Sequence, residues 1–213
     1  MKEHINSIQC KIHTCTKCSN LTQVECGHSP NIFYNKFNKV MLIGHSPKTR
    51  TKSFASTVLN MNIKNGRLYK YIENYILSPL NLTSEDIYCT NLMKCFTKNL
   101  PEDIDKQEEG FIKCMSTNCI DFLTEEIEVV NPQLIISFSE KVLNIIALHY
   151  MGQSLKMKNS FGELFEIDIN NHSYQFIPVV HMPRKLDNTD NVYKHYFPHQ
   201  TEKLKLRRID LGF

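Results

Sequence analysis

Short apolar runs alternate along this chain with stretches of helical periodicity, and this alternation limits the possible folds more than any other feature. The runs at 39–43, 87–92 and 134–138 are brief and continuous, as expected of strands buried on both faces. The stretches at 67–77 and 111–130 carry apolar residues at spacings of three and four, which is typical of amphipathic helices. Strands that alternate with helices predict an α/β fold with a mostly parallel sheet.

The same alternation continues into the last third of the chain. Residues 140–150 predict a helix, and residues 162–169 and 174–181 predict two more strands. Residues 198–208 predict a final helix that is rich in lysine and arginine.

Length and composition favour one globular domain over residues 1–213, because 41% of the residues are hydrophobic and 22% are charged. Residues 1–38 carry four of the eight cysteines, and we expect them to form a cysteine-bearing arm that packs on the body. No apolar run approaches the ~18 residues of a membrane span. The start of the chain lacks the apolar core of a secretory signal, so a cytoplasmic location is expected.

Eight cysteines without a secretory signal favour metal or cluster ligation over a disulfide framework. Cys15 and Cys18 form a CxxC pair, Cys95 directly follows a predicted strand, and Cys114 and Cys119 lie on or near the next helix. Four thiolates can hold either a zinc ion or a [4Fe-4S] cluster, and the spacing does not separate the two. The remaining cysteines are interpreted as small buried hydrophobic residues: Cys10, Cys26 and Cys89.

Ligands of open parallel sheets bind where the carboxyl ends of the strands meet the loops. Three segments of the chain follow predicted strands in this way, namely 44–47, 91–95 and 181–184. We therefore expect the residues of these three segments to form one site.

The order of these motifs resembles that of the iron-sulfur uracil-DNA glycosylases, families 4 and 5 of the uracil-DNA glycosylase superfamily. The resemblance runs from about Cys15 to Arg208 and rests on the CxxC pair and on the segments VMLIGHSP (40–47), IYCTNLMKC (87–95), NPQLIISFS (131–139), SFGELFEI (160–167) and VVHMP (179–183). It implies a three-layer α/β/α fold, a DNA substrate and a structural [4Fe-4S] cluster in preference to zinc. Cys15, Cys18 and Cys95 would be three ligands of that cluster. Cys119 is favoured as the fourth because of its register to Pro132, and Cys114 is the alternative.

The resemblance also assigns two residues to the extruded base. Asn91 matches the asparagine that reads the edge of the base, and its amide can pair with the N–H and carbonyl of uracil. His181 takes the place of a histidine that donates a hydrogen bond to the base oxygen and stabilises the charge that develops there. The alternatives are an asparagine that caps a strand end and a histidine with a purely structural role.

The first motif departs from the family. The family reads GEAPG or GLAPA where this chain has GHSPK, formed by Gly44, His45, Ser46, Pro47 and Lys48. No carboxylate stands in this motif to activate water, so His45 is a candidate base or electrostatic donor and Ser46 a candidate to position the water. Gly44 and Pro47 are expected to contact the substrate.

The aromatic residue on which the base would stack is also displaced. Phe54 is the nearest candidate, whereas the register to Gly66 points to Ile63 or Lys64. Because the loop that would contact the base is altered, a deaminated or modified base other than uracil is also a candidate substrate.

Charge is unevenly distributed along the chain, although its formal sum is only +3. Residues 184–208 hold seven basic and three acidic residues, whereas 102–128 hold nine acidic and two basic residues. The basic side chains predict a phosphate-binding face beside the pocket, with the acidic face elsewhere. The basic residues concerned are Arg184, Lys185, Lys194, Lys203, Lys205, Arg207 and Arg208, together with Lys48, Arg50 and Lys52 on the first loop. Arg184 is the member expected to contact the substrate. A solvated surface without a partner is the alternative.

Three aromatic residues follow His181, namely Tyr193, Tyr196 and Phe197. They suit two roles equally, as a wedge in the space left by a flipped nucleotide or as packing for the last helix.

The predicted function is a monofunctional DNA glycosylase that excises uracil or a related damaged or modified base by hydrolysis. No lysine is placed as a Schiff-base nucleophile, so strand cleavage is not expected. A monomer that binds DNA without a protein partner is expected. The alternatives are a reader of damaged DNA on the same fold, a protein that traps DNA covalently through His45, and a zinc protein unrelated to glycosylases.

Overall fold

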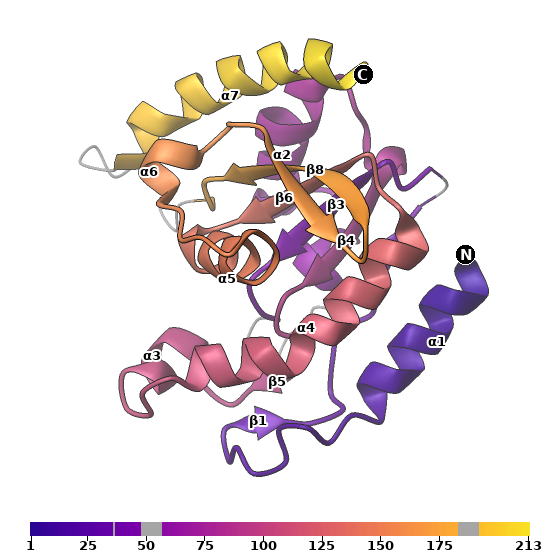
Figure 1. Cartoon of the computed structure of the whole chain (residues 1–213), viewed down its shortest axis with the longest axis vertical. Coiled ribbons are helices and arrows are strands. Elements are labelled where there is room, and N and C mark those ends of the chain that lie inside the picture. Colours follow the sequence, from indigo (N-terminus) through magenta and orange to yellow (C-terminus); the bar gives the residue numbers. More distant parts are fainter. Residues whose placement is uncertain (36, 48–56, 183–191) are drawn as a thin grey trace.

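The computed structural model describes the whole chain except residues 36, 48–56 and 183–191. Its centre is a mixed, mostly parallel sheet (Figure 1). The spatial order of the strands is β2 (Phe33–Tyr34), β4 (Ile87–Asn91), β3 (Val40–Gly44), β6 (Leu134–Phe138), β8 (His172–Val179) and β7 (Phe165–Ile169). The four central strands run parallel, and β2 and β7 are antiparallel at the edges.

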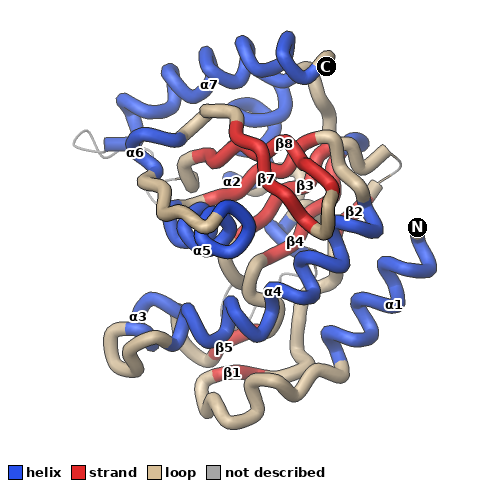
Figure 2. The backbone as a smooth tube through the Cα atoms, in the orientation of Figure 1, coloured by secondary structure: helices blue, strands red, loops and turns tan. Residues whose placement is uncertain are grey.

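Helices lie on both sides of this sheet (Figure 2). The α-helices of the described residues are α1 (Lys2–His13), α2 (Arg67–Ile72), α3 (Pro101–Asp105), α4 (Phe111–Val130), α5 (Glu140–Met151), α6 (Met157–Ser160) and α7 (Val192–Leu211). Helices α4 and α5 cover one face, and α2 and α7 cover the other. The three-layer α/β/α architecture is thus confirmed. Every residue of β3, β4 and β6 is buried, as the continuous apolar runs predict.

Short elements connect these layers. Four helical turns are η1 (Val58–Asn60), η2 (Glu73–Leu77), η3 (Ser78–Leu80) and η4 (Ser84–Asp86). Two further strands, β1 (Val24–Glu25) and β5 (Phe96–Thr97), pair with each other in a separate ribbon. Within the described residues, no helix has both the length and the apolar character needed to cross a membrane.

The N-terminal arm contains a helix, α1, that was not predicted from the sequence. Ile5, Ile8 and Ile12 lie on one side of α1 and are at most 2% exposed. Because α1 contacts α4, this apolar side attaches the arm to the helix that carries Cys114 and Cys119. The spacing of three and four residues was the available signal.

Four predicted elements need correction. The last helix begins at Val192 instead of Pro198, which lies inside it. The helix predicted over 67–77 is an α-helix only to Ile72 and continues as a turn of π-helix. The predicted strands 162–169 and 174–181 cover 165–169 and 172–179, because the partners pair antiparallel around a tight turn at Asn170 and Asn171.

Candidate active site and cysteine cavity

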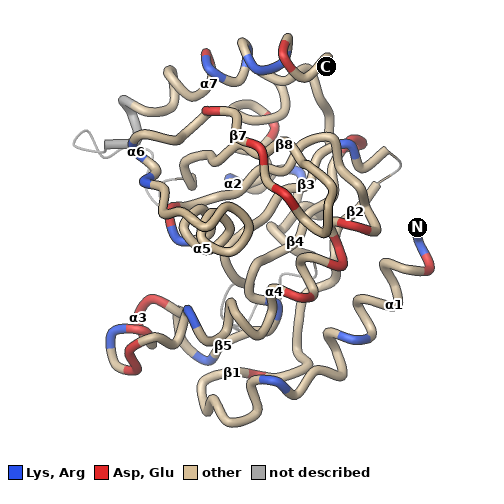
Figure 3. Tube along the Cα trace, in the orientation of Figure 1, with Lys and Arg blue, Asp and Glu red and all other residues tan. Residues whose placement is uncertain are grey.

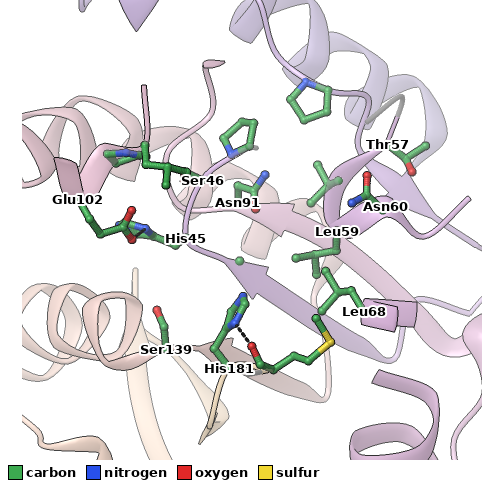
Figure 4. Close-up of a pocket in the computed structure, with 17 residues that line it drawn as sticks. His45, Ser46, Thr57, Leu59, Asn60, Leu68, Asn91, Glu102, Ser139 and His181 are labelled. Carbon is green, nitrogen blue, oxygen red and sulfur yellow. Dashed lines mark hydrogen bonds and ion pairs between the residues drawn. The ribbon is translucent and has the colours of Figure 1, made fainter. Parts of the chain in front are cut away.

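A cavity of about 630 Å³ lies at the carboxyl ends of β3, β4, β6 and β8 (Figure 4). The segments that follow these four parallel strands meet there, as expected for an open α/β sheet. The polar lining residues are His45, Ser46, Thr57, Asn60, Asn91, Glu102, Ser139 and His181, and the others are Pro30, Gly44, Pro47, Val58, Leu59, Leu68, Leu100, Pro101 and Met182. All three predicted site segments therefore contribute to one cavity.

Asn91 ends β4 and is only 3% exposed, yet its Oδ1 atom has no hydrogen-bond partner in the structure. Gly44 pairs with it across the strands. A Cβ atom on Gly44 would lie 2.4 Å from Oδ1 of Asn91 and 2.8 Å from Cδ2 of Leu59, so only glycine leaves the amide room. A buried carbonyl oxygen without a donor is costly, and it suits a ligand that brings an N–H group.

His181 lies on the opposite side of the cavity and is exposed. Its Nδ1 atom is 2.8 Å from the carbonyl oxygen of Met182. Because a carbonyl only accepts, Nδ1 carries the proton, and Nε2 of the neutral ring is an acceptor. In this conformation His181 can donate from Nε2 to a base oxygen only as the imidazolium.

Glu102 brings into the cavity a carboxylate that was not predicted from the sequence. It lies in the first turn of α3, and its Oε1 atom is 3.5 Å from Nδ1 of His45. The pair with His45 lowers the pKa of Glu102 to about 2, and Lys141 contributes to the same effect. The acidic segment 102–128 was expected to lie away from the pocket, and this expectation is wrong for its first residue.

Three lining residues adopt left-handed backbone conformations that side chains other than glycine rarely take. These are Leu59 and Asn60, both with φ of 54°, and Ser139 with φ of 79°. The hydroxyl of Ser139 is also buried without a partner. Such strain costs on the order of 1–3 kcal/mol per residue and is typical of functional sites.

Two of the predicted substrate contacts, Phe54 and Arg184, lie outside the described residues, as do Lys48, Arg50, Lys52 and Lys185. Ile63 is 49% exposed, and neither it nor Lys64 lines the cavity. In the part of the chain that the structure describes, the apolar walls are aliphatic, with Leu59, Leu68 and Met182 in place of an aromatic ring.

The basic character of α7 is largely neutralised by nearby carboxylates. Lys203 and Arg207 each lie 2.7 Å from Glu163, and Lys205 lies 2.8 Å from Glu202. Figure 3 shows acidic and basic positions interspersed along this helix. These three residues are thus paired with carboxylates in the structure, and their contact with DNA phosphates stays a prediction.

Two of the three aromatic residues of this region pack α7 onto the body. Phe197 is 9% exposed and lies against Tyr71 and Tyr75, with ring centroids 5.4 and 5.5 Å apart. Tyr196 lies edge-on to Phe161. Both residues have the packing role, and the side chain of Tyr193 lies outside the described part.

Half of the residues that line a second, small cavity are cysteines, and they come from both halves of the chain. Its sulfur-bearing residues are Cys15, Cys18, Cys26, Cys95 and Cys119. Cys114 is exposed, and it is not among the lining residues. Burial raises the pKa of Cys95 to about 12 and that of Cys119 to about 11.

The other cysteines were interpreted as buried hydrophobic residues. This is confirmed for Cys89, which is fully buried in β4, and wrong for Cys10, which is exposed on α1. Cys26 is half-buried and lines the cysteine cavity. The ribbon of β1 and β5 brings it close to Cys95, and this pairing could not be read from spacing alone.

The thiol-rich donor set suits either zinc or an iron-sulfur cluster. Among the described residues, no three His, Cys, Asp or Glu side chains converge as a group that could hold one metal ion. A four-iron cluster binds each cysteine through a different iron, so its ligands need not meet at one point. The five cysteines around one cavity therefore fit a cluster.

A buried ion pair lies beside the cysteine cavity, which Lys94 also lines. Nζ of Lys94 is 2.6 Å from Oε2 of Glu126 and 2.8 Å from Oγ1 of Thr90, which in turn donates to Oε1 of Glu126. The side chain of Glu126 is fully buried, and that of Lys94 is 4% exposed. This network joins α4 to the segment that connects Asn91 with Cys95.

A family model described as the uracil DNA glycosylase superfamily matches residues 32–205. The match covers most of the chain, including every residue that lines the large cavity except Pro30, and it begins after Cys15, Cys18 and Cys26. A comparison with curated proteins finds no match.

Proposed function

Because the chain belongs to the uracil-DNA glycosylase superfamily, whose enzymes act on DNA, we propose that it is a monofunctional glycosylase that excises a damaged or modified base. Uracil or a related deaminated base is the proposed substrate. The observation that carries this proposal is the buried amide of Asn91, whose unpartnered oxygen belongs to a cavity at the carboxyl ends of the strands.

The amide suits a base with an N–H group next to a carbonyl. Its Oδ1 atom would accept from that N–H, and its Nδ2 group would donate to the carbonyl oxygen. Cytosine lacks a proton on the corresponding ring nitrogen and would leave Oδ1 without a donor. A cavity that holds one flipped base and contacts its pairing edge therefore favours deaminated bases.

The residues around the cavity divide the chemistry between binding and activation. Asn91 holds the base, and His181 as an imidazolium would stabilise the negative charge on its oxygen. His45 and Ser46 line the same cavity and are the residues proposed to hold a water molecule next to the sugar. No lysine is proposed as a Schiff-base nucleophile, so the proposed reaction is a hydrolysis without strand cleavage.

The proposal is tested with labelled oligonucleotides that carry uracil, hypoxanthine, xanthine or a modified cytosine, in single- and double-stranded form. Strand breaks that appear only after alkali would show base excision without strand cleavage and would identify the base. DNA binding without alkali-sensitive sites on any substrate would favour a non-catalytic reader of damaged DNA. An adduct that survives denaturation would favour the covalent trap.

We also propose that Cys15, Cys18, Cys95 and Cys119 hold a structural [4Fe-4S] cluster. The cluster would tie the N-terminal arm to α4 and to the strand end that carries Asn91, and no step of the reaction is assigned to it. Cys119 is proposed as the fourth ligand because it is buried and lines the cavity, whereas Cys114 is exposed and does not line it.

Replacing Cys119 with serine is expected to remove the visible absorbance of the anaerobically purified protein and to lower its iron content. Cys114→Ser lies on the same helix and is the matched control, which should keep both signals. Loss of the cluster in Cys114→Ser with retention in Cys119→Ser would reverse the assignment. A colourless wild-type protein that contains zinc would contradict the cluster itself.

A further inference from the structure

The first motif lacks a carboxylate, yet the folded cavity contains one. Glu102 comes from the start of α3 and lies 3.5 Å from His45, the residue that directly follows β3 (Figure 4). Asn91 and His181 line the same cavity. A histidine and a carboxylate thus face each other next to the residues that would hold the base.

The two nitrogens of His45 have different surroundings. Nδ1 faces Oε1 of Glu102, whereas Nε2 is buried and has no hydrogen-bond partner in the structure. The His45 side chain as a whole is only 11% exposed. A buried ring nitrogen without a partner, on a cavity residue, has its lone pair or proton available to a ligand or a water molecule.

The charge on Glu102 decides which nitrogen carries the proton. Because the pKa of Glu102 is lowered to about 2, its side chain is a carboxylate at any pH used for assay. A carboxylate only accepts hydrogen bonds, so it favours the proton on Nδ1. Nε2 of the neutral ring then has a free lone pair.

We propose that Glu102 is a positioning residue that holds His45 in the tautomer whose Nε2 accepts a proton from the attacking water. This inference rests on the proposed glycosylase function. In other hydrolases too, a carboxylate orients a catalytic histidine and fixes its tautomer. Glu102 replaces the missing motif carboxylate only indirectly, because it acts through His45.

The proposed step is the hydrolysis of the bond between the base and the deoxyribose. The water oxygen forms a bond to C1′ of the deoxyribose as the bond from C1′ to the base nitrogen breaks, and the electron pair of that bond leaves with the base. One proton of the water passes to Nε2 of His45. His45 then returns this proton to the base anion, so the products are the neutral base and an abasic sugar.

Glu102→Gln is expected to lower the single-turnover excision rate roughly 10²-fold, because the amide can donate to Nδ1 and favour the wrong tautomer. DNA affinity and thermal stability should not change. Asp103→Asn is the matched control, since this neighbour on α3 loses the same charge but pairs with Lys106 instead of His45. Combining Glu102→Gln with His45→Gln should cost no more than His45→Gln alone.

Two kinetic results would overturn the positioning role. One is a Glu102→Gln enzyme as fast as Asp103→Asn. The other is a double variant in which the two losses multiply, because Glu102 would then act independently of His45.

A measurement without turnover separates this inference from the proposed function. Nitrogen-15 NMR of the imidazole rings, assigned with His45→Gln, should show the proton of His45 on Nδ1 in the wild type and not in Glu102→Gln. A proton on Nε2 in the wild type would overturn the positioning role even if the protein excises bases. A wild type that excises no base would overturn the proposed function, whatever the tautomer.

Discussion

Replacing Asn91 with alanine is expected to lower the rate of base excision roughly 10³-fold, as judged from the loss of both hydrogen bonds in a water-excluded site. The variant removes the only described amide that is buried at the carboxyl end of the strands and lines the cavity. Its fold should remain intact, because Oδ1 has no protein partner to lose. Single-turnover assays on the best substrate of the wild type measure the effect.

Asn144→Ala is the matched control for this prediction. Asn144 also has an unpartnered buried Oδ1 atom, but it lies on α5 and does not line the cavity. Its replacement should leave the excision rate unchanged. Equal losses in the two variants would show that Asn91 acts on stability alone and does not bind the base.

Replacing Lys94 with methionine is expected to lower the free energy of unfolding by about 3–5 kcal/mol. The substitution leaves the carboxylate of Glu126 fully buried and without its cation, while the hydroxyl of Thr90 still donates to Oε1. An uncompensated buried charge is the main cost, since the attraction within the pair only offsets desolvation. Urea unfolding followed by circular dichroism, with all proteins purified under the same anaerobic conditions, measures the change.

Lys11→Met provides the comparison, because Lys11 pairs with Glu125, the neighbour of Glu126 on α4. That pair is exposed, with 53% of the lysine side chain and 36% of the glutamate side chain accessible, and should contribute no more than about 1 kcal/mol. Combining Lys94→Met with Glu126→Met should recover much of the loss. A Lys94→Met protein as stable as Lys11→Met would contradict the importance of the buried network.

The fold was predictable where a local pattern determines the element. The helix at Phe111–Val130 and the strand at Leu134–Phe138 have the predicted bounds, because periodicity and the break at Asn131 and Pro132 act on neighbouring residues. The two-residue strands β1, β2 and β5 could not be predicted in this way. They exist through pairing with distant segments, and two residues carry no periodicity.

The site was predictable only in part for the same reason. Gly44 and Asn91 end buried strands and His45 directly follows one, and strand ends can be read from the sequence. Glu102 lies on α3, far along the chain from His45, so only the tertiary structure brings the two side chains together. Its neighbours in the sequence are also acidic, which made a solvated surface the natural interpretation.

The most direct test of hydrolytic excision is to count both products of one reaction. A uracil-containing oligonucleotide, or the substrate identified with the panel, is incubated with excess protein, and free base and abasic sites are quantified together. The account predicts one molecule of free base for each abasic site, with no DNA attached to protein after denaturation. Bound DNA with no free base, or free base matched by a covalent protein–DNA adduct, would contradict it.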